Sequence, residues 1–292
     1  MKDIQLWTAL ITPLTENGEV NFAELEKLIG LQADAGNGVL ILGSTGEGLA
    51  FSEKEKNEIL DFVSKLPKRT PVMMGVGGFD INQQVKWIQR CNKAGVDALL
   101  VVTPLYAKPG FNGQLHWFKT LLDAAELPCM LYNVPSRTAV KMIPGVLAEL
   151  RDHPNFWSVK EASGSVEQYL GYREAAPDAK FFSGDDALTA FFAQAGCHGL
   201  VSVASNPWPK ATNLYVKKCL TGLTDGLFPV WNRAVDALFA VSSPVPTKCL
   251  MKEKDLISNA VLRPPLSQHD LQDTAQLLEA DKQIGEWYSA NK

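Results

Sequence analysis

The stretch Phe156-Trp157-Ser158-Val159-Lys160 places a single charged residue at the end of an apolar run. The run has the composition of a buried strand, and burying a cation there is costly unless the cation is neutralised or used. A desolvated lysine has a lowered pKa and offers a free amine for Schiff-base chemistry. The alternative is a strand-end lysine whose stem is buried and whose ammonium reaches water. Neighbouring segments must decide between the two.

This run is one of eight short apolar runs whose starts lie roughly 20–30 residues apart, the length of one βα unit. Because the runs are continuous rather than alternating, we expect parallel strands covered by helices. The eight predicted strands are Trp7–Thr12, Val39–Gly43, Val72–Gly77, Ala98–Thr103, Cys129–Asn133, Trp157–Ala162, Lys180–Gly184 and Gly199–Ala204.

Helical patterns with start signals lie between these runs. Ser52-Glu53-Lys54-Glu55 is a capping box ahead of apolar residues with a helical period. Asn21 and Asp80 are the predicted N-caps of two further helices.

Eight βα units predict an α/β fold, a (β/α)₈ TIM barrel, with catalytic groups at the carboxyl ends of the strands. A doubly wound sheet is the competing architecture, but Gly75-Val76-Gly77-Gly78 does not complete a dinucleotide fingerprint, and Gly43–Gly48 lacks the ending of a P-loop. Three helical patterns follow the last predicted strand. We therefore expect a catalytic barrel over residues 1–223 and a small C-terminal helical appendage over residues 224–292.

Charge, hydropathy and the spacing of histidines and cysteines exclude several classes of function. The formal net charge of −4 and the absence of a basic stripe argue against nucleic-acid binding. No apolar run approaches the roughly 18 residues of a membrane span, and no secretory segment develops before Pro13. We expect a cytoplasmic protein with no metal site, because the histidines lack ligand spacing and the cysteines are scattered, odd in number and typical of reduced thiols. The cysteines are Cys91, Cys129, Cys197, Cys219 and Cys249.

Several motifs around the predicted strands together indicate a class I aldolase-type enzyme, and they resemble the pyruvate-dependent aldolase family of N-acetylneuraminate lyase and dihydrodipicolinate synthase. The resemblance covers nearly the whole chain, from Thr8 to Lys248. Its motifs are Gly43-Ser44-Thr45-Gly46-Glu47, Tyr132-Asn133-Val134-Pro135-Ser136-Arg137-Thr138, Lys160-Glu161-Ala162-Ser163-Gly164, Ser183-Gly184-Asp185-Asp186 and His198-Gly199-Leu200-Val201-Ser202. The Tyr132–Thr138 motif is closer to the synthase branch than to the sugar-acid lyases.

The resemblance implies the condensation of pyruvate with L-aspartate-4-semialdehyde on the route to diaminopimelate and lysine. Lys160 is then the residue that forms an imine with pyruvate, and this covalent bond takes the place of a cofactor. Tyr132 is the phenol that relays protons, and Ser44 bridges it to Tyr106, which enters the site of a neighbouring subunit. A homodimer is therefore the minimum assembly and a homotetramer is expected. Without the resemblance, Tyr132 could be a barrel-core tyrosine and Tyr106 an ordinary loop aromatic.

The substrate-binding roles also come from the resemblance. Thr45 is expected to bind the pyruvate carboxylate, largely through its backbone N–H. Arg137 is expected to bind the carboxylate of the aldehyde, where a guanidinium offers two parallel hydrogen bonds; alone, it reads as a surface loop arginine. Gly184 and Val201 contribute backbone carbonyls near the site, and Glu47 is structural.

Two other functions compete with the synthase. Another pyruvate-dependent lyase, acting on N-acetylneuraminate or a 2-keto-3-deoxy sugar acid, would share Lys160 and Tyr132, and Ser44 is more typical of the neuraminate enzymes. Arg137 discriminates against that lyase. A non-catalytic binding protein is disfavoured because the set Lys160, Tyr132, Ser44 and Tyr106 is complete.

The sequence departs from the family at its inhibitor site. Members inhibited by lysine bind it at the dimer interface with a tyrosine, an asparagine, a glutamate and a histidine or glutamate. With one residue deleted between positions 57 and 79, those positions hold Leu105, Phe79, Gln83 and Lys56. An anionic partner is lost and a cation is gained, so we expect weak or absent inhibition by L-lysine.

Overall fold

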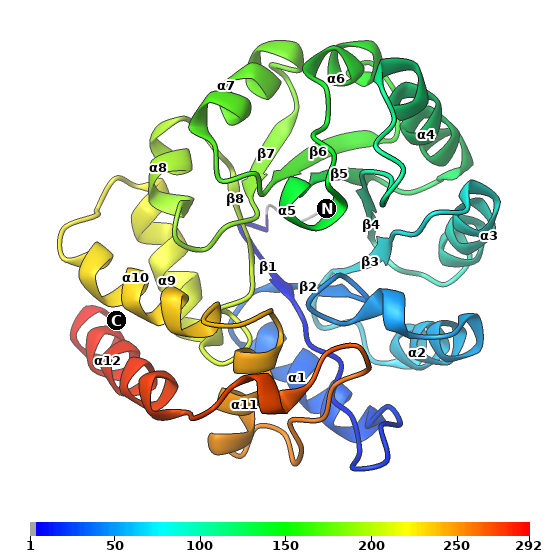
Figure 1. The fold of residues 1–292 in the computed structure, drawn as a ribbon. Coiled ribbons are helices and arrows are strands. Elements are labelled where there is room, and N and C mark those ends of the chain that lie inside the picture. Colours follow the sequence, from blue (N-terminus) through cyan, green and yellow to red (C-terminus); the bar gives the residue numbers. More distant parts are fainter. Residues whose placement is uncertain (1–3) are drawn as a thin grey trace.

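The computed structural model describes residues 4–292, and within them eight parallel strands form a closed barrel (Figure 1). Each strand pairs with the next, and β8 pairs with β1, with Leu200 beside Leu6. The strands are β1 (Leu6–Ala9), β2 (Gly38–Ile41), β3 (Val72–Val76), β4 (Ala98–Val102), β5 (Cys129–Asn133), β6 (Phe156–Glu161), β7 (Lys180–Ser183) and β8 (Gly199–Ser202). The predicted TIM barrel is confirmed.

Helices surround the barrel, and a further group follows β8 (Figure 1). Around the barrel they are α1 (Phe22–Asp34), α2 (Glu53–Lys65), α3 (Ile81–Asn92), α4 (Phe111–Ala124), α5 (Pro135–Thr138), α6 (Pro144–Leu150), α7 (Val166–Ala175), α8 (Thr189–Gln194) and α9 (Pro209–Leu220), with the 3₁₀ turn η1 (Gly48–Ala50). The chain continues through α10 (Leu227–Leu238), α11 (Val245–Glu253), the 3₁₀ turn η2 (Gln268–Asp270) and α12 (Ala275–Asn291).

Each predicted strand coincides with an observed one, although several end earlier than expected. The first run was expected over Trp7–Thr12, whereas β1 ends at Ala9. Leu10 still donates its N–H to the Leu40 carbonyl at 3.0 Å, but the pairing of β1 with β2 stops beyond that residue. Apolar composition alone does not mark where a strand leaves the ladder, because the residues after it remain buried.

The predicted helix starts are also confirmed. The Ser52 hydroxyl accepts from Glu55 N, and the Glu55 carboxylate accepts from Ser52 N at 2.9 Å, which completes the capping box. Asn21 and Asp80 cap α1 and α3 through their side-chain oxygens. Local hydrogen-bonding chemistry therefore sets these boundaries.

Two apolar layers hold the barrel. Side chains such as Trp7, Met73, Met130 and Phe182 fill its interior. A larger cluster lies between the strands and the surrounding helices. Because every strand is buried on both faces, the strand sequences are continuous apolar runs, as expected for parallel strands covered by helices.

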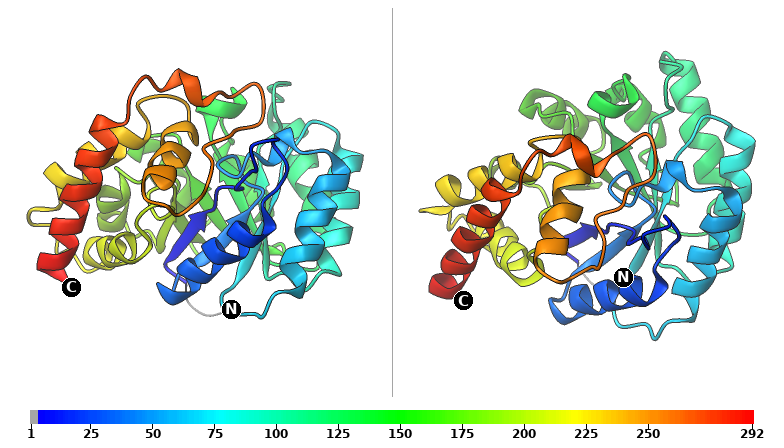
Figure 2. Two further views of the ribbon diagram at one scale, coloured as in Figure 1. Left: turned by 90° about the horizontal axis from the view of Figure 1, so that it is seen from below. Right: turned by 60° about the horizontal axis from the view of Figure 1, so that its bottom comes forward.

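The helices after β8 lie along one side of the barrel (Figure 2). α10 and α12 share an apolar cluster with α9, centred on Trp231, Trp208 and Tyr215. The chain beyond α11 then passes beside α1, where Lys27 Nζ donates to the Asp255 carbonyl at 3.1 Å. The division of the chain at residue 224 stays a prediction.

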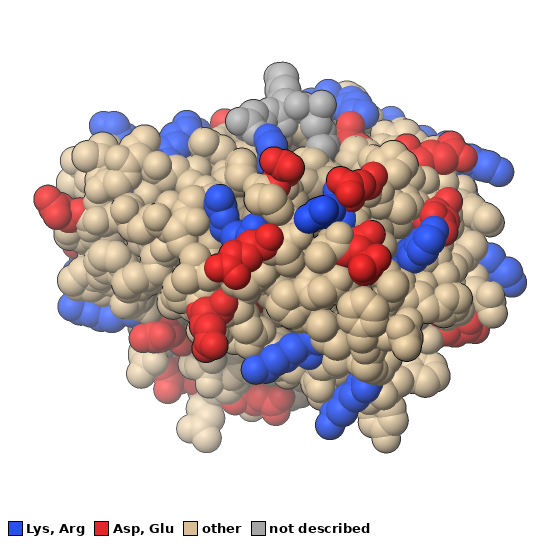
Figure 3. Space-filling model, turned by 90° about the horizontal axis from the view of Figure 1, so that it is seen from above, with Lys and Arg blue, Asp and Glu red and all other residues tan. Residues whose placement is uncertain are grey.

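Acidic and basic side chains are interspersed on the face shown in Figure 3. Among the described residues, no helix combines the length and the apolar character needed to cross a bilayer.

Candidate active site

Two neighbouring strands bring Tyr132 and Lys160 together near the carboxyl end of the barrel. Tyr132 on β5 is the register partner of Lys160 on β6. The Lys160 Nζ lies 4.3 Å from the centroid of the Tyr132 ring. Lys160 is 4% exposed and Tyr132 is 6% exposed, so the amine is a buried group and not a strand-end lysine with its head in water.

Burial sets the protonation of Lys160. It lowers the pKa of the amine to about 7, because the ammonium loses its hydration. The Asp186 carboxylate raises this pKa and the Arg137 guanidinium lowers it. At neutral pH a large fraction of Lys160 is therefore a free amine, which is the nucleophilic form.

The loop after β2 brings Ser44 to the same place. Burial raises the pKa of Tyr132 to about 12, while the Arg137 charge and the nearby Ser44 hydroxyl lower it. The Ser44 hydroxyl therefore lies near the Tyr132 phenol. Tyr132 therefore keeps its proton at neutral pH and can donate it. Thr45, the next residue in the loop, is 3% exposed.

Arg137 lies in the short helix α5, where the sequence indicated a loop. Pro135 at the first turn fits the start of a helix, and Ala139 ends it with a φ of 58°. In Figure 1, α5 lies over the centre of the barrel. Arg137 Nη2 donates to the Ser243 carbonyl at 3.3 Å, and its charge influences the pKa of both Tyr132 and Lys160. The guanidinium therefore lies near the reactive pair.

Gly184 and Val201 also lie at this site. A Cβ atom at Gly184 would lie 2.8 Å from the Cε of Lys160, so a larger residue there would displace the lysine. Val201 is fully buried in the cluster that contains Tyr132. Gly184 therefore lies against Lys160, whereas the role of Val201 stays a prediction.

Tyr106 does not join the others within this chain. Its side chain is 87% exposed, and its backbone adopts a φ of 66° in the left-handed region. Such a conformation is uncommon for a residue other than glycine. The ring therefore extends away from the chain's own barrel.

Two carboxylates near the site were not assigned from the sequence. Lys160 is not the sole charge on its strand, because β6 includes the fully buried Glu161, whose carboxylate accepts from Asn133 Nδ2 at 2.8 Å and from Ser163 N at 2.6 Å. Burial raises the pKa of Glu161, and these hydrogen bonds lower it. The reasoning applied to Lys160, a charge in a buried strand, could have identified Glu161.

The second carboxylate is Asp186, which is 1% exposed. It accepts from Ser202 Oγ at 2.5 Å and from Val203 N at 3.0 Å. Burial raises its pKa to about 6, and these hydrogen bonds lower it. Its motif was recognised, but only the fold brings its charge near Lys160.

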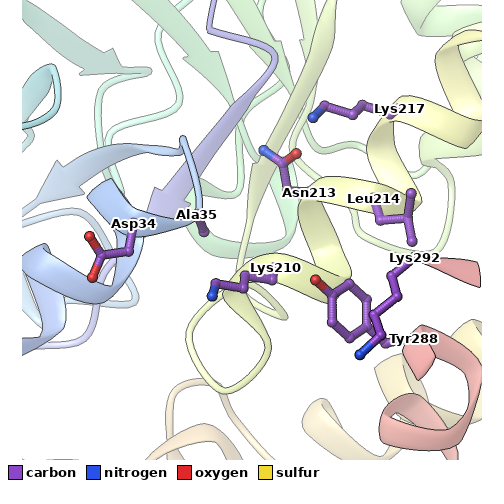
Figure 4. Close-up of a pocket in the computed structure, with 8 residues that line it drawn as sticks. All are labelled: Asp34, Ala35, Lys210, Asn213, Leu214, Lys217, Tyr288 and Lys292. Atoms are coloured by element: carbon purple, nitrogen blue, oxygen red, sulfur yellow. The ribbon is translucent and has the colours of Figure 1, made fainter.

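A separate surface pocket of about 210 Å³ lies where α1, α9 and α12 meet (Figure 4). The ammonium groups of Lys210, Lys217 and Lys292 point in different directions there and do not converge on one point. None of the residues around Lys160 lines it. Within residues 4–292, no group of three or more His, Cys, Asp or Glu side chains is placed to hold a metal ion.

Comparison with known proteins finds one family. Residues 3–284 match the model of the dihydrodipicolinate synthetase family. The 4-hydroxy-tetrahydrodipicolinate synthase of Francisella philomiragia is 45% identical over 98% of this chain and 97% of the relative. That of Wolbachia pipientis wMel is 40% identical over 98% of each.

Solved structures are similar throughout their length. The chloride-inhibited dihydrodipicolinate synthase of Acinetobacter baumannii, complexed with pyruvate, has a TM-score of 0.90 and 29% identity over 97% of this chain and 99% of that one. The enzyme of Cyanidioschyzon merolae with lysine bound has a TM-score of 0.90 and 29% identity over 97% of this chain and 98% of that one.

We predict that acetylation of Lys160 by acetic anhydride reaches its half-maximal rate near pH 7. Only the neutral amine reacts, so a pKa of about 7 leaves about one tenth of the plateau rate at pH 6. Competitive isotope labelling with peptide mass spectrometry measures this profile.

Asp186→Asn removes the anion that raises the Lys160 pKa. The midpoint of the Lys160 acetylation profile is therefore expected to shift to lower pH. Asp185→Asn is the matched control: Asp185 acts on Lys160 only through Asp186, so the midpoint moves less than in Asp186→Asn. A midpoint near pH 10 in the unsubstituted protein contradicts the desolvated amine.

Proposed function

The chain belongs to the dihydrodipicolinate synthetase family, and we propose how its residues condense pyruvate with L-aspartate-4-semialdehyde to 4-hydroxy-tetrahydrodipicolinate. The amine of Lys160 attacks the ketone carbon of pyruvate and loses water to form an imine. Loss of a methyl proton gives an enamine, whose carbon adds to the aldehyde and regenerates an imine. The amino group of the former aldehyde substrate then attacks the imine carbon, which closes the ring and releases the Lys160 amine. The observation that carries this proposal is the buried amine of Lys160, which lies against the Tyr132 ring.

Tyr132 and Ser44 move the protons in these steps. Dehydration of the first adduct needs a proton for the departing hydroxyl, and the aldehyde oxygen takes one when the new carbon–carbon bond forms. The Tyr132 ring lies against the Lys160 amine, and the Ser44 hydroxyl is near enough to lower the pKa of the phenol. A hydroxyl chain accepts and donates in turn, so it can return each proton to its starting point.

Each substrate is oriented through its own carboxylate group. Thr45 binds the pyruvate carboxylate through its backbone N–H, in the loop that also carries Ser44. Arg137 binds the carboxylate of the aldehyde, and the influence of its charge on both Lys160 and Tyr132 supports this role. Gly184 and Val201 supply carbonyl groups around the imine. The covalent bond to Lys160 activates pyruvate, so the proposal requires no cofactor or metal.

A second copy of the chain completes the site. Tyr106 extends into solvent from the loop after β4, and the segments after β2 and β3 also expose apolar side chains, Leu49 at 58% and Phe79 at 67%. Burying this surface against a partner places Tyr106 in the partner's relay, so a homodimer is the smallest active assembly. A second apolar surface, formed by Leu170 and Phe191 on α7 and α8, supports a homotetramer. Five free cysteines support a reducing, cytoplasmic location.

The positions that correspond to the inhibitor site of the family lack the groups that would bind L-lysine. Gln83 is an exposed neutral amide at the start of α3, and Lys56 on α2 adds an amine. A lysine ligand carries two ammonium groups that need anions or oxygen acceptors once they are partly desolvated. A nearby cation opposes such a ligand by on the order of 1–4 kcal/mol.

Reduction by borohydride in the presence of pyruvate tests the assignment of Lys160. The reduced adduct is expected on the peptide that contains Lys160. Lys160→Arg is expected to abolish the adduct and most activity, because a guanidinium stays protonated and cannot attack a carbonyl. Labelling of a different lysine contradicts the assignment. Equal turnover of N-acetylneuraminate and L-aspartate-4-semialdehyde by the unsubstituted enzyme favours the rival lyase.

Mixing two inactive variants tests the shared site. Tyr106→Phe subunits retain Lys160, and Lys160→Ala subunits supply Tyr106, so each heterodimer has one complete site. Random exchange restores about one quarter of the full activity, because half of the dimers are mixed and half of their sites are complete.

The matched control is a mixture of Tyr132→Phe subunits with Lys160→Ala subunits. Both of these residues belong to the site of their own chain, so no mixed dimer contains a complete site. That control stays inactive. If the Tyr106→Phe mixture also stays inactive after subunit exchange is confirmed by mass spectrometry, Tyr106 does not act in the partner.

Initial rates at millimolar L-lysine test the inhibitor surface. We expect little inhibition, because a loss of about 3 kcal/mol weakens binding about a hundredfold. Gln83→Glu combined with Lys56→Glu restores anionic partners and increases the sensitivity. Inhibition of the unsubstituted enzyme at sub-millimolar lysine disproves this interpretation of the surface.

A further inference from the structure

A buried ion pair joins the C-terminal region to the loop of the active site. Lys248 on α11 lies 2.5 Å from Glu47 Oε1, and the exposed fractions of the two residues are 0% and 5%. The second carboxylate oxygen accepts from Arg263 N at 2.6 Å, and Lys248 Nζ also donates to the Val261 carbonyl at 2.8 Å. Both charges therefore have partners on a segment that lies outside the eight βα units.

Glu47 closes the turn that carries Ser44 and Thr45. Its N–H donates to the Ser44 carbonyl at 3.1 Å, and the next residue, Gly48, donates to the Gly43 carbonyl at 3.0 Å. Glu47 adopts a φ of 56°, in the left-handed region that residues with a Cβ rarely occupy. Such a conformation persists only where surrounding contacts fix it.

The same segment contacts the far side of this turn. Arg263 pairs with Glu55 at the start of α2, and its guanidinium lies 4.8 Å from the centroid of the Phe51 ring. Glu55 in turn caps α2 through Ser52. Residues 248–263 therefore hold the carboxyl end of the turn and the start of α2 that follows it.

A buried ion pair is weak evidence for a contribution to stability, because an apolar pair of similar volume often serves as well. Removing one partner is different, because it leaves an uncompensated charge in the interior. A Glu47 carboxylate without Lys248 would move toward water and release the left-handed turn. Loss of one partner is therefore expected to disturb the geometry of the turn as well as to lower the stability of the fold.

We propose that Lys248 is a positioning residue for pyruvate: through Glu47 it fixes the turn in which Thr45 receives the substrate carboxylate. The inference rests on the proposed function, in which Thr45 binds that carboxylate. Lys248 touches neither the substrate nor the reacting atoms, and it acts through the backbone of the turn.

Lys248→Met tests the inference. We expect the KM for pyruvate, and the pyruvate concentration that half-saturates borohydride trapping, to rise by about tenfold to a hundredfold, since a displacement of about 1 Å has effects of this size. The KM for the aldehyde is expected to stay within about twofold, because Arg137 does not belong to this turn. Lys248→Arg, which keeps the cation, is expected to recover part of the loss.

Lys254→Met is the matched control. Lys254 follows α11 and pairs with Asp281 on α12, away from the turn. Its loss is expected to lower the thermal midpoint without changing the KM for pyruvate. If Lys248→Met cannot be purified, the nearly isosteric Glu47→Gln tests the same contact and is expected to raise the same KM.

Two outcomes overturn the inference. If the variants lower the thermal midpoint but keep the pyruvate KM within twofold, while trapping still labels Lys160, the ion pair is only structural and the proposed function stands. If pyruvate and borohydride fail to label Lys160 in the unsubstituted enzyme, both the proposed function and the inference fail.

Discussion

The register between β5 and β6 is the constraint on which the active site depends. The pairing shifts by one residue between Cys129 and Met130, so that Tyr132 lies beside Lys160. Without this shift Tyr132 would lie beside Val159, and Lys160 beside Asn133. Because neighbouring side chains along a strand point to opposite faces, a slip of one residue would separate the phenol from the amine. Bulges of this kind often lie next to active sites, where they redirect a side chain.

Charges around the pair set the reactivity of the amine. Burial destabilises the ammonium of Lys160, Arg137 adds to that effect, and Asp186 opposes it. Because Asp186 is itself buried and has a raised pKa, its influence is greatest when it is ionised. Arg137 also lowers the pKa of the neighbouring phenol. One guanidinium therefore favours the neutral amine and the anionic phenol together.

The sequence predicted the parts of the fold that depend on local patterns. The continuous apolar runs predicted all eight strands, and Ser52, Asn21 and Asp80 predicted helix starts, because capping involves residues close in the chain. The bulge at Cys129 was not predictable, since either register buries an apolar strand. Helix α5 was interpreted as a loop because four residues carry too little periodicity.

For the site, too, local motifs were predictable from the sequence, whereas contacts between distant segments were not. Lys160, Tyr132 and Ser44 were identified by their motifs, and the structure brings them together. The contact of Lys248 with Glu47 was not predicted, because it joins distant segments and an isolated lysine in a helix gives no sign of its partner. The proposed contact of Tyr106 with a second chain lies beyond what the sequence of one chain describes.

The ion pair between α11 and the β2 loop also limits how the protein can be divided. The eight βα units contain Lys160, Tyr132 and Arg137, so a minimal barrel would retain the reacting groups. It would lack Lys248 and Arg263, whose contacts fix the turn at Glu47. Shortening the enzyme, permuting its ends or exchanging its C-terminal helices with those of a relative is therefore also a change to its active site. Recombination within this fold must transfer the turn and its distant cation as one unit.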